Sequence, residues 1–489
     1  MPDPVLLIVV PLGFSFLIPL FGLISRKIEK FIPPIVLLFN LILSLIFLPV
    51  VIRKPVVSSI GGFIHPFSIN IYAGTLGVLF TVVISLIGFA VSLYAIGYIK
   101  EGATQKYHML YLLLLTGATG VVLTADIFNL FVFYEILCIS SYALVAYSGD
   151  KAGVESASKY LIQGSIGSTL MLIAIALIYG QFGTLNMASI AQNIKTSHPI
   201  HIYVPLILFI TGVGVEAAIF PLNAWLPDAH SSAPSTISAV LSGIAIKMGI
   251  YVIIRIVYTI FGSTDILFLL VVVAVATLLI GEFSAFSQHN IKRMLAYSST
   301  GQIGLILFAL ALGSSNGISA GIFQFINHAL SKSLLFLSTG YMICRTGSME
   351  ISALEGMGKK MPVSSLAFTV GAFSLIGLPP FVGFPSKFLI VKAALSKGGF
   401  LPIVLIMIVL FGTVIEAVYF FKVIQVFYFK ESKEPIERRE APPIAIIPLI
   451  ILVIMILAVG LYPYIITGVL NNAASELLKR TVYIRGVLG

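Results

Sequence analysis

Ionisable residues interrupt the long apolar stretches of this 489-residue sequence at places where a folded chain would bury them. At the centre of a membrane helix each such group costs ~2.5–3.5 kcal/mol, so several in one chain need a role that offsets the cost. Desolvation favours the neutral forms of Lys and Glu, which lets them exchange a proton when a neighbouring charge moves. We therefore predict a proton or ion relay built from Glu135, Glu216, Lys247, His328, Lys332, Lys387 and Glu416.

The depth of these residues within the apolar stretches supports a relay. Glu135 lies in the middle of an aromatic and aliphatic run. Lys247 lies about twelve residues, or ~18 Å, into a helix that is expected to begin near Ser235. Neither side chain can easily reach a membrane surface. His328 and Lys332 are four residues apart, so they share one helix face.

Two of the apolar stretches are broken by proline, at residues 220–227 and 377–385. Glu216 lies four residues before the first break, and Lys387 lies two residues after the second. Broken backbone leaves room for water beside a titratable group. Matched Gly/Pro breaks in two halves of a chain indicate an inverted-repeat transporter with a site near the membrane midplane. Proline also interrupts ordinary membrane helices, so the breaks alone do not establish a transporter.

Simpler interpretations of the same charges stay open. A buried charge can form a static pair that only fixes helix packing, and this alternative applies above all to Glu416 and His328. Asp126, Asp228 and His230 lie near the ends of expected spans, where each could be a relay member, a helix cap or a polar loop residue.

The elements that must position these residues are membrane-spanning helices. Apolar runs long enough to cross a hydrocarbon core of ~30 Å recur along the chain, and they predict an all-α polytopic membrane protein with about fourteen transmembrane helices. The expected spans are 4–24, 32–52, 70–99, 108–124, 126–148, 157–180, 202–222, 234–260, 265–287, 293–313, 317–343, 363–397, 401–429 and 443–468.

These spans fall into groups that define the domain organisation. Residues 1–107 would hold helices 1–3, residues 108–260 a first repeat of helices 4–8, and residues 261–430 a second repeat of helices 9–13. An odd number of helices in each repeat turns the second copy upside down relative to the first, with helices 7 and 12 broken. Residues 431–489 would hold the last helix and a short C-terminal tail.

Composition excludes a water-soluble globule, because 58% of the residues are hydrophobic and 10% are charged, against roughly 25% charged in an average soluble domain. The net charge of +10 comes from basic residues in short connections and not from a basic stripe, so nucleic acid is not an expected partner. Lipid head groups and the positive-inside rule account for these residues, and Lys292 and Arg293 are interpreted as topology anchors. The predicted location is the cell (inner or cytoplasmic) membrane, with both termini outside.

No catalytic residue, cofactor site or metal site is predicted within the chain. Cys138 and Cys344 lie inside apolar runs and have no metal-binding or disulfide spacing. Zinc-binding spacing, a Gly-rich phosphate loop and a Ser/His/Asp set are missing. Any enzymatic activity would therefore belong to a larger complex of which this chain is a part.

Four motifs make the sequence resemble the antiporter-like subunits shared by multisubunit sodium/proton antiporters, complex I and energy-converting membrane-bound hydrogenases. The motifs are residues 124–135 (TADIFNLFVFYE), 225–230 (WLPDAH), 291–299 (IKRMLAYSS) and 327–332 (NHALSK). The resemblance covers about residues 80 to 430, and its first motif looks most like the D subunit of the sodium/proton antiporters. It implies that Glu135 is the essential glutamate of helix five, Lys247 the lysine of helix eight, His328 and Lys332 the helix-eleven pair, and Lys387 the ionisable group of broken helix twelve.

One position departs from the family pattern. Glu216 stands where most relatives carry a lysine on broken helix seven, the ion-pair partner of the helix-five glutamate. Two facing glutamates would repel, so one would hold a proton at neutral pH unless Lys247 or a cation lies between them. Either the first half conducts protons with Glu216 as a relay group, or the carboxylates help to bind a cation such as sodium.

The expected function is that of a proton-translocating, antiporter-like subunit of an energy-converting respiratory complex, hydrogenase-type or complex I-like. The driving redox reaction would lie in other subunits. Expected partners are further membrane subunits, including another antiporter-like subunit, a peripheral redox module, and lipid. One alternative is the D subunit of a stand-alone multisubunit sodium/proton antiporter. A more distant alternative is a structural membrane subunit with static salt bridges.

Overall fold

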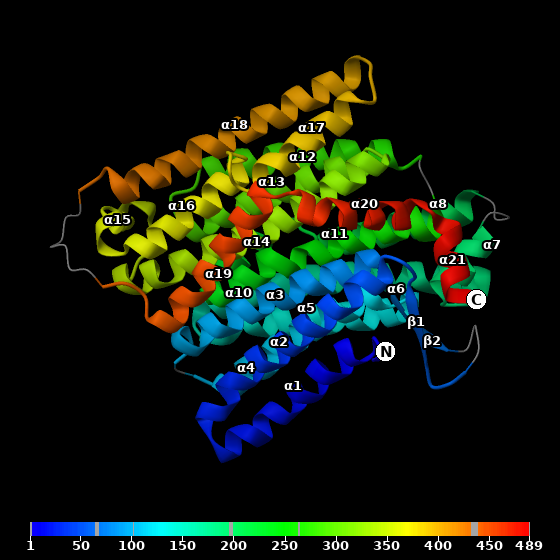
Figure 1. Cartoon of the computed structure of the whole chain (residues 1–489), viewed down its shortest axis with the longest axis horizontal. Coiled ribbons are helices and arrows are strands. Elements are labelled where there is room, and N and C mark those ends of the chain that lie inside the picture. The colour runs from blue at the N-terminus through cyan, green and yellow to red at the C-terminus, as the bar shows by residue number, and fades with distance from the viewer. Residues whose placement is uncertain are drawn as a thin grey trace.

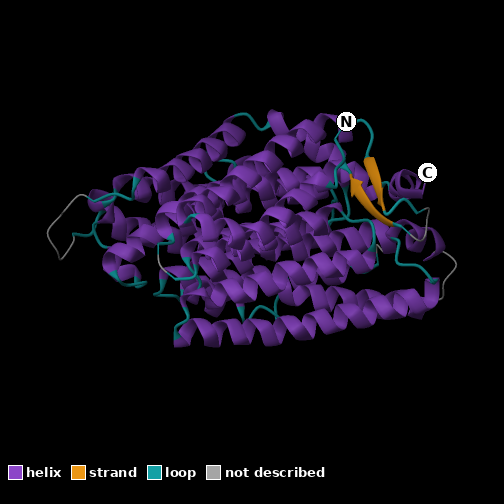
Figure 2. Ribbon diagram, turned by 90° about the horizontal axis from the view of Figure 1, so that it is seen from below, coloured by secondary structure: helices purple, strands orange, loops and turns teal. Residues whose placement is uncertain are grey.

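The computed structural model describes residues 2–63, 68–100, 102–194, 199–262, 265–431 and 439–488. It is an elongated bundle of helices, most of which run roughly along the long axis (Figure 1). A single two-stranded antiparallel sheet, β1 (Val56–Ile60) with β2 (Ile69–Ala73), is the only sheet of the described part. The strands and both chain termini gather at one end of the bundle (Figure 2).

The N-terminal part contains α1 (Leu6–Ile24), α2 (Arg26–Val51) and α3 (Thr75–Tyr98). The third span was predicted to begin at residue 70, but residues 69–73 form strand β2 and the helix begins at Thr75. A strand and a helix that are both apolar and buried cannot be separated by hydropathy alone. Gly74, in extended backbone, marks the change.

The next part contains α4 (Thr104–Leu123), α5 (Ile127–Val145), α6 (Lys151–Phe182), α7 (Met187–Asn193), α8 (Pro199–Glu216) and α9 (Leu226–Ser232). One long span follows, assigned as α10 (Ser235–Val240), the π-helix η3 (Leu241–Ala245), α11 (Ile246–Ile254) and the π-helix η4 (Arg255–Phe261). Helix α8 ends at Glu216 and not near residue 222 as predicted. The chain leaves helical geometry directly after it, with Ala218 at a φ of 53°.

The third part contains α12 (Leu267–Phe286), α13 (Ile291–Ala311), α14 (Ser315–Thr346), α15 (Met357–Lys360), α16 (Pro362–Ile376), α17 (Gly383–Leu395) and α18 (Phe400–Tyr428). The predicted break at 377–385 lies between α16 and α17. Helix α14 runs through the middle of the molecule and packs against α13, α16, α17 and α20 (Tyr464–Leu478).

Twelve helices are long and apolar enough to cross a membrane, against about fourteen spans predicted. The expected spans at 317–343 and 363–397 are not among the twelve. The first is the 32-residue helix α14, whose polar residues lower its hydropathy, and the second is divided into α16 and α17. The chain is thus an all-helical, multi-pass membrane protein, and the broken helix and the polar helix account for the difference in count.

The C-terminal region is more structured than the short tail predicted for it. Helix α19 (Pro443–Leu461) ends before Pro463, and α20 continues towards the end that holds the termini, where α21 (Arg480–Leu488) lies (Figure 1). On α20, Glu476 lies 3.5 Å from the Arg255 guanidinium of η4, and both side chains are nearly excluded from solvent. The rings of Tyr72 and Tyr483 lie 5.2 and 4.4 Å from this guanidinium. The C-terminal helices are therefore anchored to the long span by a buried ion pair.

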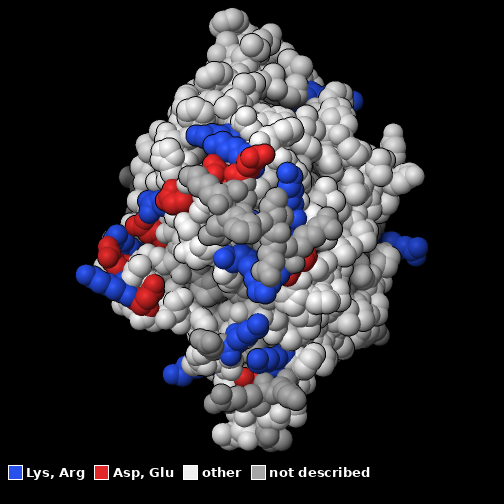
Figure 3. Space-filling model, turned by 90° about the vertical axis from the view of Figure 1, so that its left-hand side faces the viewer, with Lys and Arg blue, Asp and Glu red and all other residues white. Residues whose placement is uncertain are grey.

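Charged side chains gather at the end of the bundle opposite the termini (Figure 3). At this end Asp228 pairs with Arg293 at 2.7 Å and with Lys159 at 3.2 Å. The positive-inside rule predicts that Lys433 and Arg438 lie on the inner side of the membrane, and both residues lie outside the described part of the chain. Which face of the membrane this end meets stays a prediction from the positive-inside rule.

Candidate functional site

Glu216 is held by two tyrosines at the first broken segment. One carboxylate oxygen accepts a hydrogen bond from Tyr142 at 2.6 Å, and the other accepts one from Tyr160 at 2.8 Å. The residue is only 3% exposed, and no described ion pair includes it. Neutral hydroxyl donors therefore stabilise the carboxylate in the place where the family resemblance led us to expect a lysine.

The backbone break sets the direction of Glu216. The Trp225 indole donates a hydrogen bond of 2.8 Å to the Val215 carbonyl, one of the last carbonyls of α8, which have no partner within the helix. The same indole stacks on the Tyr160 ring, with ring centres 3.7 Å apart. The first break thus fixes both the end of α8 and one of the two tyrosines that bind Glu216.

Glu135 is not part of this cradle. It is half-buried on α5 and accepts a hydrogen bond from the Ser168 hydroxyl of α6. No hydrogen bond joins it to Glu216 in the described structure, although its charge acts on Glu216. The two glutamates that were predicted to face each other each have separate hydroxyl donors.

Gly164 of α6 makes the Glu216 cradle possible. A Cβ atom at this position would lie 1.8 Å from the Tyr142 hydroxyl and 2.6 Å from a Glu216 carboxylate oxygen. We expect Gly164→Ala to push Tyr142 away and to destabilise the protein by about 1–3 kcal/mol, as overpacking of a filled core does. The thermal unfolding temperature of the purified protein in detergent measures this. Gly180→Ala on the same helix, where a Cβ would meet no atom within 4 Å, is the control, and equal unfolding temperatures of the two variants would contradict the expectation.

Lys247 is fully buried and is solvated by backbone carbonyls. Its ammonium donates to the carbonyls of Ser242 and Gly243 at 2.6 and 2.8 Å. These carbonyls belong to the η3 segment, where the π-helical bonding pattern departs from the regular helix. The Phe325 ring lies 5.6 Å from the ammonium. In the described structure no carboxylate lies within ion-pair distance of this lysine.

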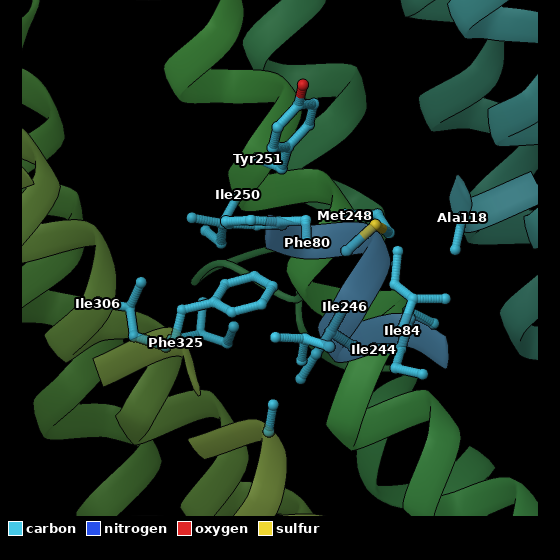
Figure 4. Close-up of a cluster of buried hydrophobic side chains, with 14 of the residues drawn as sticks. Phe80, Ile84, Ala118, Ile244, Ile246, Met248, Ile250, Tyr251, Ile306 and Phe325 are labelled. Atoms are coloured by element: carbon cyan, nitrogen blue, oxygen red, sulfur yellow. The ribbon is translucent and has the colours of Figure 1, made fainter. Parts of the chain in front are cut away.

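An apolar layer surrounds the segment that carries Lys247. Ile244, Ile246 and Ile250 of this span gather with Phe325 of α14 and Ile306 of α13 (Figure 4). On α14, Phe325 belongs to this layer while its neighbour Gln324 joins a polar chain described below. Helix α14 therefore borders both the apolar layer around Lys247 and the polar chain that includes Gln324.

His328 and Lys332 lie in the middle of α14, and both are fully buried. The Lys332 ammonium donates to the Leu295 carbonyl at 3.0 Å and lies 5.8 Å from the Phe420 ring centre. Neither ring nitrogen of His328 has a hydrogen-bond partner among the described residues. Buried polar groups are nearly always hydrogen-bonded. The two ring nitrogens of His328 are therefore available to bind water or an exchanging proton.

The second broken segment holds an ion pair. The Lys387 ammonium lies 2.7 Å from a Glu416 carboxylate oxygen and 3.3 Å from the Ile376 carbonyl. Ile376 is the last residue of α16, and carbonyls at a helix C-terminus attract cations. Gly377, at a φ of 91°, has space for the lysine stem, because a Cβ there would lie 3.0 Å from the Lys387 side chain. Two of the predicted relay residues are therefore in direct contact.

A continuous chain of hydrogen bonds connects this ion pair to α14. The Gln302 amide donates to Glu416 at 2.7 Å, and the Gln324 amide donates to Gln302 at 2.6 Å. Gln324 in turn accepts from Ser386 at 2.6 Å and from Asn327 at 3.3 Å. The chain continues where Asn327 accepts from Ser331 at 3.1 Å and from Ser374 at 2.7 Å. It ends beside Lys332, the residue that follows Ser331.

The amides of this chain were not predicted from the sequence, although a signal for them exists. Residues 324, 327, 328, 331 and 332 follow the i, i+3, i+4, i+7, i+8 spacing of one helix face, and all five are polar. Gln302 has no comparable pattern. Its role is visible only once α13 and α14 are placed side by side.

The residues with open interpretations are placed as follows. Asp126 is the N-cap of α5 and accepts from the backbone N–H groups of Phe128 and Asn129. Asp228 is a surface ion-pair partner. His230 is fully buried and stacks on Phe336. Lys292, interpreted as a topology anchor, is buried and donates to the Ala233 carbonyl at 2.5 Å.

Two broken segments, each with a buried ionisable group, and a polar chain between helices are features of a membrane protein that moves ions. Among the described residues no cluster of three His, Cys, Asp or Glu side chains suits a metal ion.

Comparison with known proteins gives the family. The family described as NADH:quinone oxidoreductase/Mrp antiporter, TM matches residues 124–416. The chain is 32% identical to NADH-quinone oxidoreductase subunit N of Desulforudis audaxviator (strain MP104C), over 85% of this chain and 86% of the relative. It is 30% identical to the Na(+)/H(+) antiporter D subunit of Bacillus subtilis (strain 168), over 88% of each chain.

A solved structure is more similar still. A chain of the membrane-bound sulfane sulfur reductase (MBS), an archaeal respiratory membrane complex, is 40% identical, covers 99% of both chains and superposes with a TM-score of 0.93. The protein therefore belongs to the NADH:quinone oxidoreductase/Mrp antiporter membrane-subunit family, and the predicted resemblance is confirmed. It is an antiporter-like membrane subunit.

Proposed function

We propose that this protein translocates protons as one subunit of a larger respiratory membrane complex, with the driving redox reaction in other subunits. The Lys387–Glu416 ion pair carries the proposal, because a hydrogen-bonded chain runs from it to the residue beside Lys332. Charge that arrives at one end of such a chain changes the stability of the pair at the other end. The similarity to a chain of the sulfane sulfur reductase complex supports a respiratory setting.

The proposal includes the topology predicted from the sequence. In it the chain crosses the membrane about fourteen times, with both termini outside. Residues 108–260 and 261–430 are inverted repeats, and each supplies one broken helix. Glu135, Glu216 and Lys247 belong to the first repeat, whereas His328, Lys332, Lys387 and Glu416 belong to the second. Other membrane subunits, among them a further antiporter-like subunit, and a peripheral redox module would be the partners.

Loss of Lys387 tests the proposal. We expect Lys387→Met to lower proton flux by about 100-fold or more, the usual contribution of a positioned proton-exchanging group. The whole complex would be purified, placed in lipid vesicles and driven by a potassium diffusion potential, with a pH-sensitive dye inside. Lys422→Met, an exposed lysine on α18, is the matched control. Wild-type flux in the Lys387→Met complex would contradict proton translocation through this chain.

A stand-alone sodium/proton antiporter is the second candidate function. The similarity to the Bacillus subtilis Na(+)/H(+) antiporter protein favours it. The subunits that copurify after gentle solubilisation distinguish the two. An iron–sulfur or hydrogenase-like module supports a respiratory complex, whereas small membrane subunits alone support the antiporter.

A further inference from the structure

Helix α12 contributes a buried carboxylate, Glu282, that lies beside the relay and was absent from the sequence prediction. It is only 2% exposed. The buried charges that act on it are those of Glu416, Lys387 and Lys332, so this interior contains two cations and two carboxylates. Only Lys387 and Glu416 form an ion pair among the described residues. Lys332 is the second cation and Glu282 is the second carboxylate. Their opposite charges compensate each other, although the two side chains form no ion pair among the described residues.

The position of Glu282 is set by α13 and α18. One of its oxygens accepts a hydrogen bond from Tyr419 at 2.9 Å. Tyr419 lies three residues after Glu416 on α18, so the two side chains share a helix face. A Cβ at Gly301 would lie 2.1 Å from the other Glu282 oxygen, so the carboxylate rests against the backbone beside Gln302, the amide bound to Glu416.

Lys332 lies close to the neighbour of Tyr419 on α18, Phe420. Its ammonium lies over Phe420, whose ring centre is 4.8 Å from that of Tyr419. Along α13, Lys332 binds the Leu295 carbonyl and Glu282 touches Gly301, which puts the two contacts ~9 Å apart along the helix axis. The two side chains thus lie along the same stretch of α13, and they form no ion pair among the described residues.

We propose that Glu282 is a proton-accepting station between Lys332 and the Lys387–Glu416 ion pair. The inference rests on the proposed function and adds a residue to its path. When the Lys332 ammonium releases a proton, the Glu282 carboxylate takes up one proton, either through water or by a hop across the Tyr419 hydroxyl. Lysine and glutamate both become neutral, so the total charge is unchanged. Neutralising both removes two unpaired buried charges, each of which is costly alone.

The same proton transfer changes the electrostatic environment of the Lys387–Glu416 ion pair. With Lys332 charged and Glu282 ionised, Lys387 and Glu416 each have a like charge nearby. After the transfer, Lys332 and Glu282 are neutral, so neither Lys387 nor Glu416 has a like charge from these two residues nearby. When the Lys387–Glu416 pair opens, the proton passes from Glu282 to the Glu416 carboxylate, and the Glu282 carboxylate is restored.

Glu282→Gln in the complete complex tests this station. The amide keeps the size of the side chain and can still accept from Tyr419, but it cannot carry the proton. We expect assembly and thermal unfolding to match the wild type, while proton flux in vesicles falls by about 100-fold. Infrared difference spectra recorded on a pH jump should also lose a carboxylic-acid C=O band. A structural role alone would not remove that band.

The outcomes separate the inference from the function on which it rests. If Lys387→Met blocks flux while Glu282→Gln retains wild-type flux and the infrared band, Glu282 is not a station and the inference is overturned. If neither substitution changes flux, the proposed function itself fails. Should Glu282→Gln not assemble, Glu282→Asp decides. The Glu282→Asp complex, whose carboxylate is one methylene shorter, is expected to assemble, to keep the infrared band and to transport protons slowly. Wild-type flux in this complex would overturn the inference.

Discussion

Gln324→Leu is expected to lower proton flux through the complex by about 100-fold, the usual contribution of a group that positions a proton transfer. Gln324 lies at the centre of the polar chain, with Gln302 as acceptor and Ser386 and Asn327 as donors. Leucine of similar size fills the space but provides neither donor nor acceptor. The chain between Lys387–Glu416 and the Lys332 side of α14 is then interrupted without the loss of any charge.

The same substitution should lower stability by a smaller, measurable amount. Each partner left buried without a hydrogen bond costs about 1–3 kcal/mol. Flux in vesicles and the thermal unfolding temperature in detergent would be measured on the same preparation. Gln425→Leu, at an exposed position on α18, is the control. Unchanged flux in a Gln324→Leu complex that is destabilised as expected would mean that protons bypass the chain.

The sequence predicted the burial of Lys247 and Lys332 correctly, but it did not predict their hydrogen-bond partners. Depth in an apolar run depends only on neighbours along the chain, and Lys247 and Lys332 are indeed fully buried. Partners come from helices far apart in sequence, so the contact between Lys387 and Glu416 was not predicted. The sequence left a static pair open for Glu416 without indicating its partner. Flux measurements on the Lys387→Met complex distinguish a static pair from one that takes part in a relay.

The hydrogen-bond partners of Glu216 were also not predicted from the sequence. The sequence predicted repulsion between two carboxylates, because charge was the only property that could be compared. In the structure, hydroxyl groups of Tyr142 and Tyr160 occupy both Glu216 oxygens, and Ser168 binds Glu135. Hydroxyl donors in apolar helices are common and do not indicate their acceptor in advance. The predicted count of about fourteen spans differs from the twelve long apolar helices for a related reason, because hydropathy does not distinguish a broken helix or a polar interior helix from a simple span.

The ion pair between Arg255 and Glu476 supports the second prediction with a large expected effect. Removing one partner of a buried ion pair leaves an uncompensated charge and usually costs about 3–5 kcal/mol. We therefore expect Glu476→Ala to lower the thermal unfolding temperature of the purified protein sharply. The Arg255 guanidinium would remain between Tyr72 and Tyr483, with no described carboxylate to balance it. Glu155→Ala, which removes a carboxylate from an exposed ion pair on α6, should have little effect.

The double variant Arg255→Met with Glu476→Met distinguishes charge from packing. Replacing a buried ion pair by apolar side chains of similar volume is often neutral or stabilising, so the double variant should be markedly more stable than Glu476→Ala. If instead it is equally unstable, the C-terminal helices depend on the shape of these side chains and not on their charges. Proton flux in the double variant adds a further distinction. Retained flux would mean that the pair only holds α20 against the long span. Lost flux would mean that Arg255 takes part in proton transfer, since it lies about two helical turns from Lys247 on the same span.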